Sequence, residues 1–342
     1  MKFGLGQFTL QIPPWDSRTP AQLYADTLDL AAFAESRGFS SFWLAEHHGA
    51  SDDYNPSLLP MLAAVAARTT VMQIGTGVLL APLHHPIRLA EDAAVVDAIS
   101  GGRLNLGLGL GWVEAEYRMF GSEMRRRGKR FDEIIDVLRL AWRGEPFTYE
   151  GEFLSFTDTL VRPRPAHSIP IWLGGQADAA VERAARLGDG HFPASVAGGM
   201  AIVERAQQIR VIREREGLTG PYRYGAFLPV GLGSDPDDGW SGIRDGVLHV
   251  RGAYMMWAQG TRDVAGAREL LMPHEDAVRA GAVCGTPTQV IEGLRPIVDG
   301  IAGSGFDDPF LSVILAPPGT PPDVARERVE RFAAEIMPAF GG

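Results

Sequence analysis

Cysteine is almost absent from this chain. One residue, Cys284, is the only cysteine among 342 residues, which excludes a disulfide within the chain and any metal cluster built from cysteines. Such sparse cysteine suits a reducing cytoplasm. No apolar run approaches the roughly 20 residues of a membrane helix, and residues 1–14 are broken by glutamines and prolines, unlike a signal peptide. We therefore expect a cytoplasmic protein that does not cross a membrane.

An excess of basic residues is lacking as well. The chain has 32 Lys and Arg against 42 Asp and Glu, a net charge of −10, with no basic stripe of the kind that nucleic acid requires. Nucleic acid is therefore not an expected partner. Apolar residues make up 45% of the chain, which is ordinary for a globular protein and sufficient for a large core. The length fits a single α/β barrel with insertions.

Short apolar runs alternate with helical patterns along the chain. Strands are expected at residues 2–9, 41–46, 72–79, 105–109, 171–173, 191–193, 222–232 and 310–315. Helices are expected at 20–37, 56–68, 86–99, 131–142, 177–187, 200–216, 288–301 and 321–340. Alternating strands and helices predict one (β/α)8 barrel domain that spans residues 1–342.

Two connections are much longer than the usual two to six residues of a βα loop. About 60 residues separate the fourth strand from the fifth, and about 55 separate the seventh strand from its helix. The second connection, residues 233–285, is rich in proline, glycine and aspartate at its start and is expected to be irregular. Long insertions at the active face are usually lids or substrate walls, so both are candidates to cover a ligand.

The second expected strand ends at Glu46-His47-His48, where α/β proteins place their chemistry. Histidine titrates near working pH, which favours catalysis. One alternative is a structural cluster paired with Arg88 or Arg103. Another is a metal pair, because carboxylates and imidazoles are metal ligands. However, neighbouring side chains at a strand end point in opposite directions, so the two imidazoles cannot easily reach one ion, and no metal is expected.

Short motifs follow one another along nearly the whole chain. They are Ala45-Glu46-His47-His48, Asn55-Pro56, Gly75-Thr76-Gly77-Val78, His85-Pro86 with Arg88-Leu89-Ala90-Glu91-Asp92, Val96-Asp97, Ser100-Gly101-Gly102-Arg103, Gly107 to Gly111, Phe120-Gly121, Arg130-Phe131-Asp132-Glu133, Gly151 beside Phe153, Ile171-Trp172-Leu173-Gly174-Gly175, Leu187-Gly188-Asp189-Gly190 and Cys284-Gly285-Thr286-Pro287. None is diagnostic alone. Together and in this order they resemble the bacterial-luciferase-like flavin-dependent oxidoreductases.

This resemblance implies an enzyme that takes reduced FMN from a separate flavin reductase and uses O2 to oxidise a small organic substrate. It also implies a homodimer. Many FMN-dependent members carry an arginine for the phosphate where this chain has Leu110, so hydride transfer with a reduced deazaflavin is an alternative. A non-catalytic flavin-binding barrel subunit is a third possibility, against which the intact Glu46-His47-His48 speaks.

The resemblance also implies roles for single residues. His47 would lie against the reactive edge of the flavin, beside Glu46, and move or donate a proton. In the family the third strand often holds a non-prolyl cis peptide under the flavin ring, and Thr76-Gly77 is the matching bond. Glycines there leave room for a flat ring, or simply for core packing. Gly109 ends the fourth strand in a glycine turn.

The expected phosphate site is Gly174-Gly175-Gln176-Ala177, where a strand leads into a helix whose free N–H groups attract anions. The alternative is a plain glycine-rich turn followed by an acidic first turn. Trp15, Trp112 and Tyr117 are candidates for the substrate pocket, although aromatic residues near helices more often belong to the core.

Overall fold

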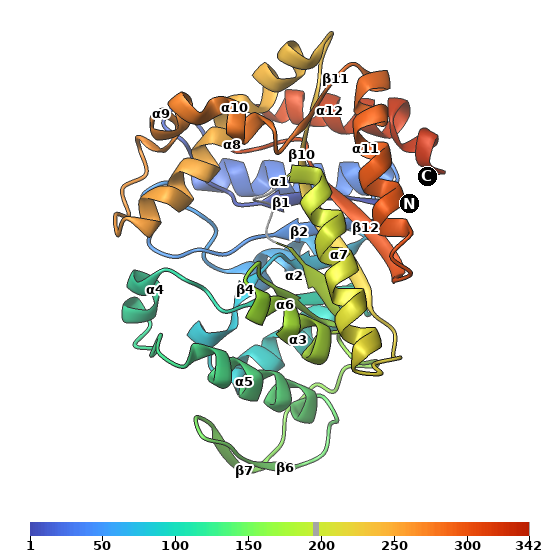
Figure 1. The fold of residues 1–342 in the computed structure, drawn as a ribbon. Coiled ribbons are helices and arrows are strands. Elements are labelled where there is room, and N and C mark those ends of the chain that lie inside the picture. Colours follow the sequence, from blue (N-terminus) through green and yellow to red (C-terminus); the bar gives the residue numbers. More distant parts are fainter. Residues whose placement is uncertain (194–197, 342) are drawn as a thin grey trace.

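The computed structural model describes residues 1–193 and 198–341. Within these residues, parallel strands surrounded by helices form a closed (β/α)8 barrel, and the β9–β10 pairing closes the ring (Figure 1). The ring consists of β1 (Lys2–Phe8), β2 (Ser41–Leu44), β3 (Gln73–Thr76) with β4 (Leu79–Leu80), β5 (Leu104–Gly109), β8 (Ile171–Gly174), β9 (Gly190–Phe192), β10 (Arg223–Leu232) and β12 (Asp307–Ile314). The predicted fold class is confirmed.

Helices cover the outside of the barrel, and the two chain ends lie side by side (Figure 1). The longer helices are α1 (Pro20–Ser36), α2 (Leu58–Arg68), α3 (Pro86–Ser100), α5 (Arg127–Ala141), α6 (Asp178–Leu187), α7 (Gly198–Arg215), α8 (Pro236–Ala258), α11 (Pro287–Ala302) and α12 (Pro322–Glu335). Short helical elements are α4 (Glu114–Met119), α9 (Ala267–Leu271), α10 (Glu275–Arg279), η1 (Ala81–Leu83), η2 (Met272–His274) and η3 (Met337–Phe340). None of the described helices is both long and apolar enough to cross a membrane.

Local sequence signals set the ends of several helices. Thr19 and Gln22 form a reciprocal capping box before α1, and Pro20 occupies the first helical position. Gly101 ends α3 with a φ of 68°, a conformation that glycine adopts without steric cost. The expected starts and stops of these two helices are therefore confirmed to within a residue or two.

Aromatic rings fill the inside of the barrel: Trp43, Trp172, Phe192, Phe227 and Phe310 form one buried cluster. Glycine makes room for them. A Cβ at Gly75 would lie 2.0 Å from the Trp43 indole. At this position the packing interpretation is confirmed, because the ring over the glycine belongs to the core.

The third strand is interrupted, and its cis bond is one residue later than predicted. The cis peptide joins Gly77 to Val78, so the expectation of Thr76-Gly77 was wrong. Thr76 still pairs with Leu44 of β2, and its hydroxyl donates to the carbonyl of Gly107 at 2.6 Å. The regular strand therefore continues through Thr76, and the chain departs from it only afterwards.

Residues 233–285 are mostly helical, so the expected irregular segment was wrong. Helix α8 begins soon after β10 ends, because Asp235 caps its first turn and Pro236 occupies the first helical position. Elements α9, η2 and α10 follow, and β11 (Val283–Gly285) then pairs with β10. The proline and aspartate that resemble a loop are thus a helix start. The insertion after β5 holds α4, α5 and a hairpin of β6 (Phe147–Glu150) and β7 (Ser155–Thr159).

Candidate functional site

The two adjacent histidines after β2 point to different partners. His47 Nδ1 lies 2.8 Å from Glu116 Oε1, whereas His48 Nε2 lies 2.6 Å from Glu46 Oε1. Both side chains are almost fully buried. The expectation that the two imidazoles diverge is confirmed. Among the described residues, no group of three or more His, Cys, Asp or Glu side chains is arranged to hold a metal ion.

Aromatic rings surround His47. The ring centroids of Tyr54, Tyr254 and Trp257 lie 5.1, 5.1 and 4.5 Å from the imidazole, and that of Trp112 lies at 6.2 Å. Tyr254 and Trp257 belong to α8, and Tyr54 follows β2 in the same loop as His47. The inserted helix therefore forms one wall of the histidine site. Apolar walls of this kind keep water away from a reacting group.

Glu116 holds one nitrogen of His47. An ionised carboxylate can only accept hydrogen bonds, so Nδ1 carries the proton in this pair. Glu116 Oε1 also accepts from the backbone N–H of His48 at 2.8 Å, and Oε2 is buried without a hydrogen bond. Glu116 lies on α4, 69 residues from His47. No sequence pattern that we used pointed to it.

Glu46 lies on the other side of the strand end. Its Oε1 accepts from His48 and, at 3.0 Å, from His84 Nε2, and its Oε2 accepts from the backbone N–H of Leu80 at 3.0 Å. Burial alone would raise the pKa of Glu46, but the hydrogen bonds from His48 and His84 lower it to about 2. The same contact with Glu46 outweighs burial and raises the pKa of His84. Glu46 is therefore an anion that ties the end of β2 to β4.

The alternative interpretation of Glu46-His47-His48, a structural cluster paired with Arg88 or Arg103, named the wrong partners. Arg88 pairs with Glu91 and Asp92 along α3. Arg103 donates to main-chain and hydroxyl oxygens near the end of α2. Neither guanidinium is bonded to the histidines or to Glu46, so the ionic balance at the strand end comes from histidine.

A second buried carboxylate, Asp52, follows in the same loop. Its Oδ2 accepts from Gln11 Nε2 at 2.6 Å and from His249 Nε2 of α8 at 2.7 Å. Between Asp52 and His47, the hydroxyls of Tyr54 and Tyr254 lie 3.2 Å apart. Burial raises the pKa of both tyrosines, so they stay neutral. Nothing in the sequence indicated that these residues would lie together.

The glycines expected beside the flavin and its phosphate lie close to buried side chains at the strand ends. A Cβ at Gly109 would lie 2.5 Å from the Val78 side chain, and a Cβ at Gly174 would lie 2.8 Å from it. A Cβ at Gly77 would lie 2.6 Å from the Phe227 ring. The ends of β3, β5 and β8 therefore approach one another only because these positions lack side chains.

Of the four expected phosphate residues, Gln176 lines a cavity of about 390 Å³. Gln176 lines it just before α6, whose N-cap is Ala177, and Arg205 and Gln208 line it from α7. Arg205 Nη1 contacts Gln208 and lies 3.3 Å from Asp178 Oδ1, while the Asp178 side chain is 82% exposed. The cavity thus lies beside the start of α6 and next to a guanidinium that is already paired with Asp178. Arg205 was not recognised from sequence.

Three aromatic residues were expected to line a substrate pocket, and the structure separates them. Trp112 stacks on Tyr254 near His47. Trp15 lies edge-on to His249, with ring centroids 5.6 Å apart. Tyr117 is buried with Leu80 and Leu83 and donates its hydroxyl to the carbonyl of Leu110. Of the three, only Trp112 is near His47.

Comparison with known proteins identifies the family to which this barrel belongs. Residues 1–302 match the model of the luciferase-like monooxygenases. The chain belongs to this family. The match spans the strand ends, the two histidines and α8, so the luciferase-like barrel accounts for the architecture of the site.

Individual luciferase-like relatives use different flavins. The chain is 33% identical over 165 residues to the oxygenase component of a flavin-dependent trigonelline monooxygenase of Acinetobacter baylyi, 47% of this chain and 46% of that one. It is also 33% identical over 178 residues to an F420-dependent glucose-6-phosphate dehydrogenase of Microbacterium testaceum, 50% of this chain and 52% of that one. The matches thus span about half the length of these curated relatives.

Solved structures share the fold of this chain. The monooxygenase RslO1 of Streptomyces bottropensis has a TM-score of 0.79 and 27% identity, with 99% of this chain and 100% of that chain covered. A coenzyme F420-dependent tetrahydromethanopterin reductase of Methanopyrus kandleri shares the fold, with a TM-score of 0.73 at 20% identity and 99% of both chains covered. The family is therefore shown, and the flavin that this member uses is a separate question.

Proposed function

We propose that this protein is a flavin-dependent monooxygenase that receives reduced FMN from a separate reductase and uses O2 to oxidise a small organic substrate. The observation that carries the proposal is the setting of His47, whose Nδ1 is held by Glu116 and whose imidazole is packed among aromatic side chains. The names of the trigonelline monooxygenase and of RslO1 support it. The flavin supplies the redox chemistry when bound.

The protein contributes proton control and a dry site. We assign to His47 the role of holding or moving a proton at Nε2, since Glu116 fixes the tautomer through Nδ1. Tyr54, Tyr254 and Trp257 exclude water around it. We assign to Glu46 an indirect role, because all of its recorded bonds go to His48, His84 and Leu80.

We place the flavin phosphate at Gln176 and Ala177. Gln176, just before the start of α6, and Arg205 line the same cavity, so an anion there would meet a guanidinium close to a helix N-terminus. Thr76, Gly77, Gly109, Gly174 and Gly175 would then border the flavin ring between this cavity and His47.

Hydride transfer with a deazaflavin is the second candidate, because one observation favours it. Leu110, at the position where many FMN-dependent members carry an arginine, packs against the hydrophobic core. The F420-dependent relatives show that this chemistry occurs among similar chains. In this case the same His47 would serve a reaction without O2.

Titration of the purified protein with reduced FMN and with a reduced deazaflavin, followed by exposure to O2, separates these candidates. We expect tight binding of reduced FMN and an altered rate of its reoxidation by O2 relative to free FMN. Tight binding of the deazaflavin alone would establish hydride transfer. Retention of a flavin without any change in its reactivity would indicate a non-catalytic subunit.

The phosphate site has its own test. Gly175→Leu is unsuitable, because Gly175 has a φ of +141° and its Cβ would lie 2.6 Å from Ala180 Cβ. Gln176→Glu instead places a negative charge beside the phosphate. We expect about tenfold or more weaker binding of FMN with little change for riboflavin, which lacks the phosphate. Equal effects on both ligands would place the phosphate elsewhere.

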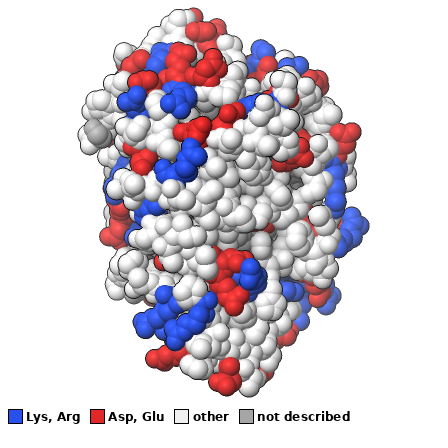
Figure 2. Space-filling model, turned by 180° about the vertical axis from the view of Figure 1, so that it is seen from behind, with Lys and Arg blue, Asp and Glu red and all other residues white. Residues whose placement is uncertain are grey.

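The side chains on the surface bear on the other partners, nucleic acid and a second copy of the chain. On the face opposite that of Figure 1, basic side chains lie beside acidic ones rather than in a basic stripe, with a broad uncharged area between the charged groups (Figure 2). We propose no nucleic acid partner. We propose a homodimer, since Val95 lines a groove between α2 and α3 and, with Ile99 one turn further along α3, exposes an apolar side chain. Light scattering of the purified protein measures its mass directly.

We also propose that residues 233–285 wall the site and move as a lid. Helix α8 buries Trp240, Leu248 and Trp257, whereas α10 has no buried residue. We therefore expect slow hydrogen exchange along α8 and faster exchange around α10, with protection of α10 on addition of flavin and substrate. Strong protection of α10 in the empty protein would contradict a lid.

A further inference from the structure

His47 is closed off from solvent in this structure. Its side chain is buried, the residue is 5% exposed, and its neighbours Tyr54 and Trp257 are 3% and 6% exposed. A molecule that reacts beside this imidazole can reach it only after part of the wall moves. The wall is formed by the loop after β2, the inserted helix α8 and the short helix α4, which lies at the edge of the molecule below α8 in Figure 1.

Helix α4 is weakly anchored. It has six residues and buries only Glu116 and Tyr117, and Val113 at its N-cap makes no side-chain capping bond. Met119 in α4 and Phe120 directly after it are 56% and 43% exposed. A helix this short is not stable without tertiary contacts. The position of α4 therefore depends on the few bonds that reach it from other segments.

Arg262, in the loop after α8, bonds to the first turn of α4. Its Nη2 donates to the carbonyl of Ala115 at 2.9 Å. Its own carbonyl accepts from the backbone N–H of Ser51 at 3.1 Å, and a Cβ at Gly49 would lie 2.8 Å from its Nη1. One exposed residue therefore joins α4, the end of α8 and the loop that carries His47.

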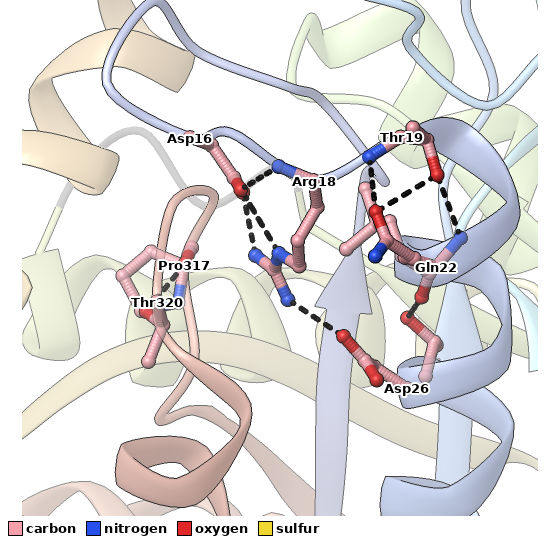
Figure 3. A network of polar contacts seen from close by, with 9 residues as sticks. Asp16, Arg18, Thr19, Gln22, Asp26, Pro317 and Thr320 are labelled. Carbon is pink, nitrogen blue, oxygen red and sulfur yellow. Dashed lines mark hydrogen bonds and ion pairs between the residues drawn. The ribbon is translucent and has the colours of Figure 1, made fainter.

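Another arginine fastens the loop after β1 more firmly. Arg18 donates to Asp16 and Asp26, and Figure 3 shows both carboxylates at its guanidinium. Burial alone would lower the pKa of Arg18, but these bonds raise it. Arg262 instead donates to a neutral carbonyl at an exposed position, and such a bond is weaker than one to a charged group. Of these two loops, the α4 side is therefore the easier to open.

Glu116 also makes an outward movement of α4 less costly. In the closed position its Oε1 is bonded to His47 and to the backbone N–H of His48, but among the described residues its Oε2 is buried without a hydrogen bond. A buried carboxylate oxygen without a partner is costly, and movement of α4 outward would give this oxygen to water. The gain offsets part of the loss of the two bonds to Oε1.

We propose that α4 is the gate to His47 and that Arg262 is its latch. When the bond from Arg262 to Ala115 breaks, α4 moves outward with Glu116 and a small molecule reaches the imidazole. When the bond forms again, Glu116 returns to Nδ1 of His47. The moving part is α4, which lies outside the lid proposed for residues 233–285, and only the identity of the admitted molecule rests on the proposed function.

Labelling of the full chain with diethyl pyrocarbonate, without flavin, measures access to His47 directly. The reagent modifies neutral imidazoles that it can reach, and peptide mass spectrometry gives the rate at each histidine. We expect slow labelling of His47 in the wild type. In Arg262→Gln it should be roughly three- to tenfold faster, as the loss of one hydrogen bond from the closed state would give. Loss of the positive charge alone would slow labelling, because it favours the protonated imidazole.

Other histidines of the same chain serve as internal controls. The exposed His274 should be labelled at the same rate in the wild type and in Arg262→Gln. His191 is completely buried inside the barrel and should stay protected in both. Amide hydrogen exchange of residues 114–120 should quicken in Arg262→Gln by the same factor as the labelling of His47.

Two further variants separate the latch from a general effect of removing an arginine. Arg295→Gln is the matched control, because this exposed guanidinium also donates to a main-chain carbonyl, that of Ala339, and it should change neither measurement. Arg262→Lys keeps the charge and a donor, so it should restore part of the protection of His47.

Stopped-flow binding of reduced FMN adds a second measurement, which rests on the proposed function. The latch is lost from the closed state whether the site is empty or occupied. The association and dissociation rates should therefore rise by the same factor in Arg262→Gln, with an unchanged Kd. A protein that binds no FMN would contradict the proposed function, and the labelling of His47 would still decide whether α4 is a gate.

Any of four results would overturn the gate. The first is labelling of His47 in the wild type as fast as that of His274. The second is unchanged labelling of His47 in Arg262→Gln. The third is an equal acceleration at His191, which would show a general loosening of the barrel. The fourth is binding of FMN at unchanged rates in Arg262→Gln.

Discussion

The two sides of the β2 end differ in how completely their hydrogen bonds are satisfied. On the His48 side, both Glu46 oxygens accept from a neighbour, and the whole group is closed. On the His47 side, Glu116 Oε2 is buried without a hydrogen-bond partner among the described residues. A buried network in which every member is bonded rigidifies a fold, whereas an unbonded buried oxygen leaves room for a further partner. Two equally buried histidines therefore differ in how completely their carboxylate partners are bonded.

The largest effect that tests this contrast is expected for His47→Asn. Loss of an acid–base group should reduce turnover by roughly 10²–10⁴, with folding and flavin affinity close to those of the wild type. Turnover is measured with reduced FMN and a substrate that the wild type oxidises. The matched control is His48→Asn, which changes the neighbouring residue on the closed side.

We expect His48→Asn to lower stability more than turnover. Equal losses of turnover at the two positions would remove the distinction between the two sides. Release of a metal ion by both changes would show instead that the two histidines share one metal site.

A smaller loss is expected for Glu116→Gln, which keeps the size of the side chain but removes its charge. Turnover should fall by roughly 10- to 100-fold, because the tautomer of His47 is no longer fixed. The low-pH limb of the pH–turnover profile should move to lower pH, since the protonated imidazole loses a nearby anion. Glu114→Gln is the control on the same helix, with its side chain largely exposed, and should change neither measurement. An unchanged pH profile in Glu116→Gln would mean that Glu116 only braces the fold.

Glu46→Gln tests the closed side through stability. The pKa of Glu46 is lowered from 4.5 to about 2, so its contribution is present above 4.5 and is lost as pH falls toward 2. The pKa of His84 is raised, so the contribution of its charge is present below 6.5 and is lost as pH rises through the raised value.

The free energy of unfolding should therefore differ most between wild type and Glu46→Gln from about pH 4.5 to 6.5, by about 1–3 kcal/mol. Urea unfolding at pH 3, 5.5 and 8 measures this difference. A difference that is the same at all three values would show that ionisation of Glu46 does not stabilise the fold.

The smallest effect is expected at the Tyr54–Tyr254 pair, which joins the loop after β2 to α8. Tyr254→Phe leaves the Tyr54 hydroxyl buried without its partner and should cost about 1 kcal/mol of stability. The double change with Tyr54→Phe should cost less than the sum of the single changes, because neither hydroxyl is then left unpaired. Additive losses would show that the two hydroxyls do not interact.

Local signals in the sequence were enough for the barrel and for one half of the site. The alternation of apolar strands and capped helices gave the fold class, since each element needs a face to bury. His47 and His48 were located because a strand end is visible in the sequence. Arg205, Glu116 and His249 were missed because each reaches the site from a helix far along the chain. The segment after β10 was misjudged because aspartate and proline begin helices as readily as they form loops.

The sequence by itself determined which residues end the strands and which helices begin at capping residues, because these choices depend on neighbours along the chain. Only the tertiary structure decided that His47 meets Glu116 while His48 meets Glu46, and that α8 supplies aromatic walls. Those partners are set by barrel closure, which brings strand ends and insertions to one rim. A side chain's function there depends on which hydrogen bonds remain unmade, and that is a property of contacts rather than of spacing.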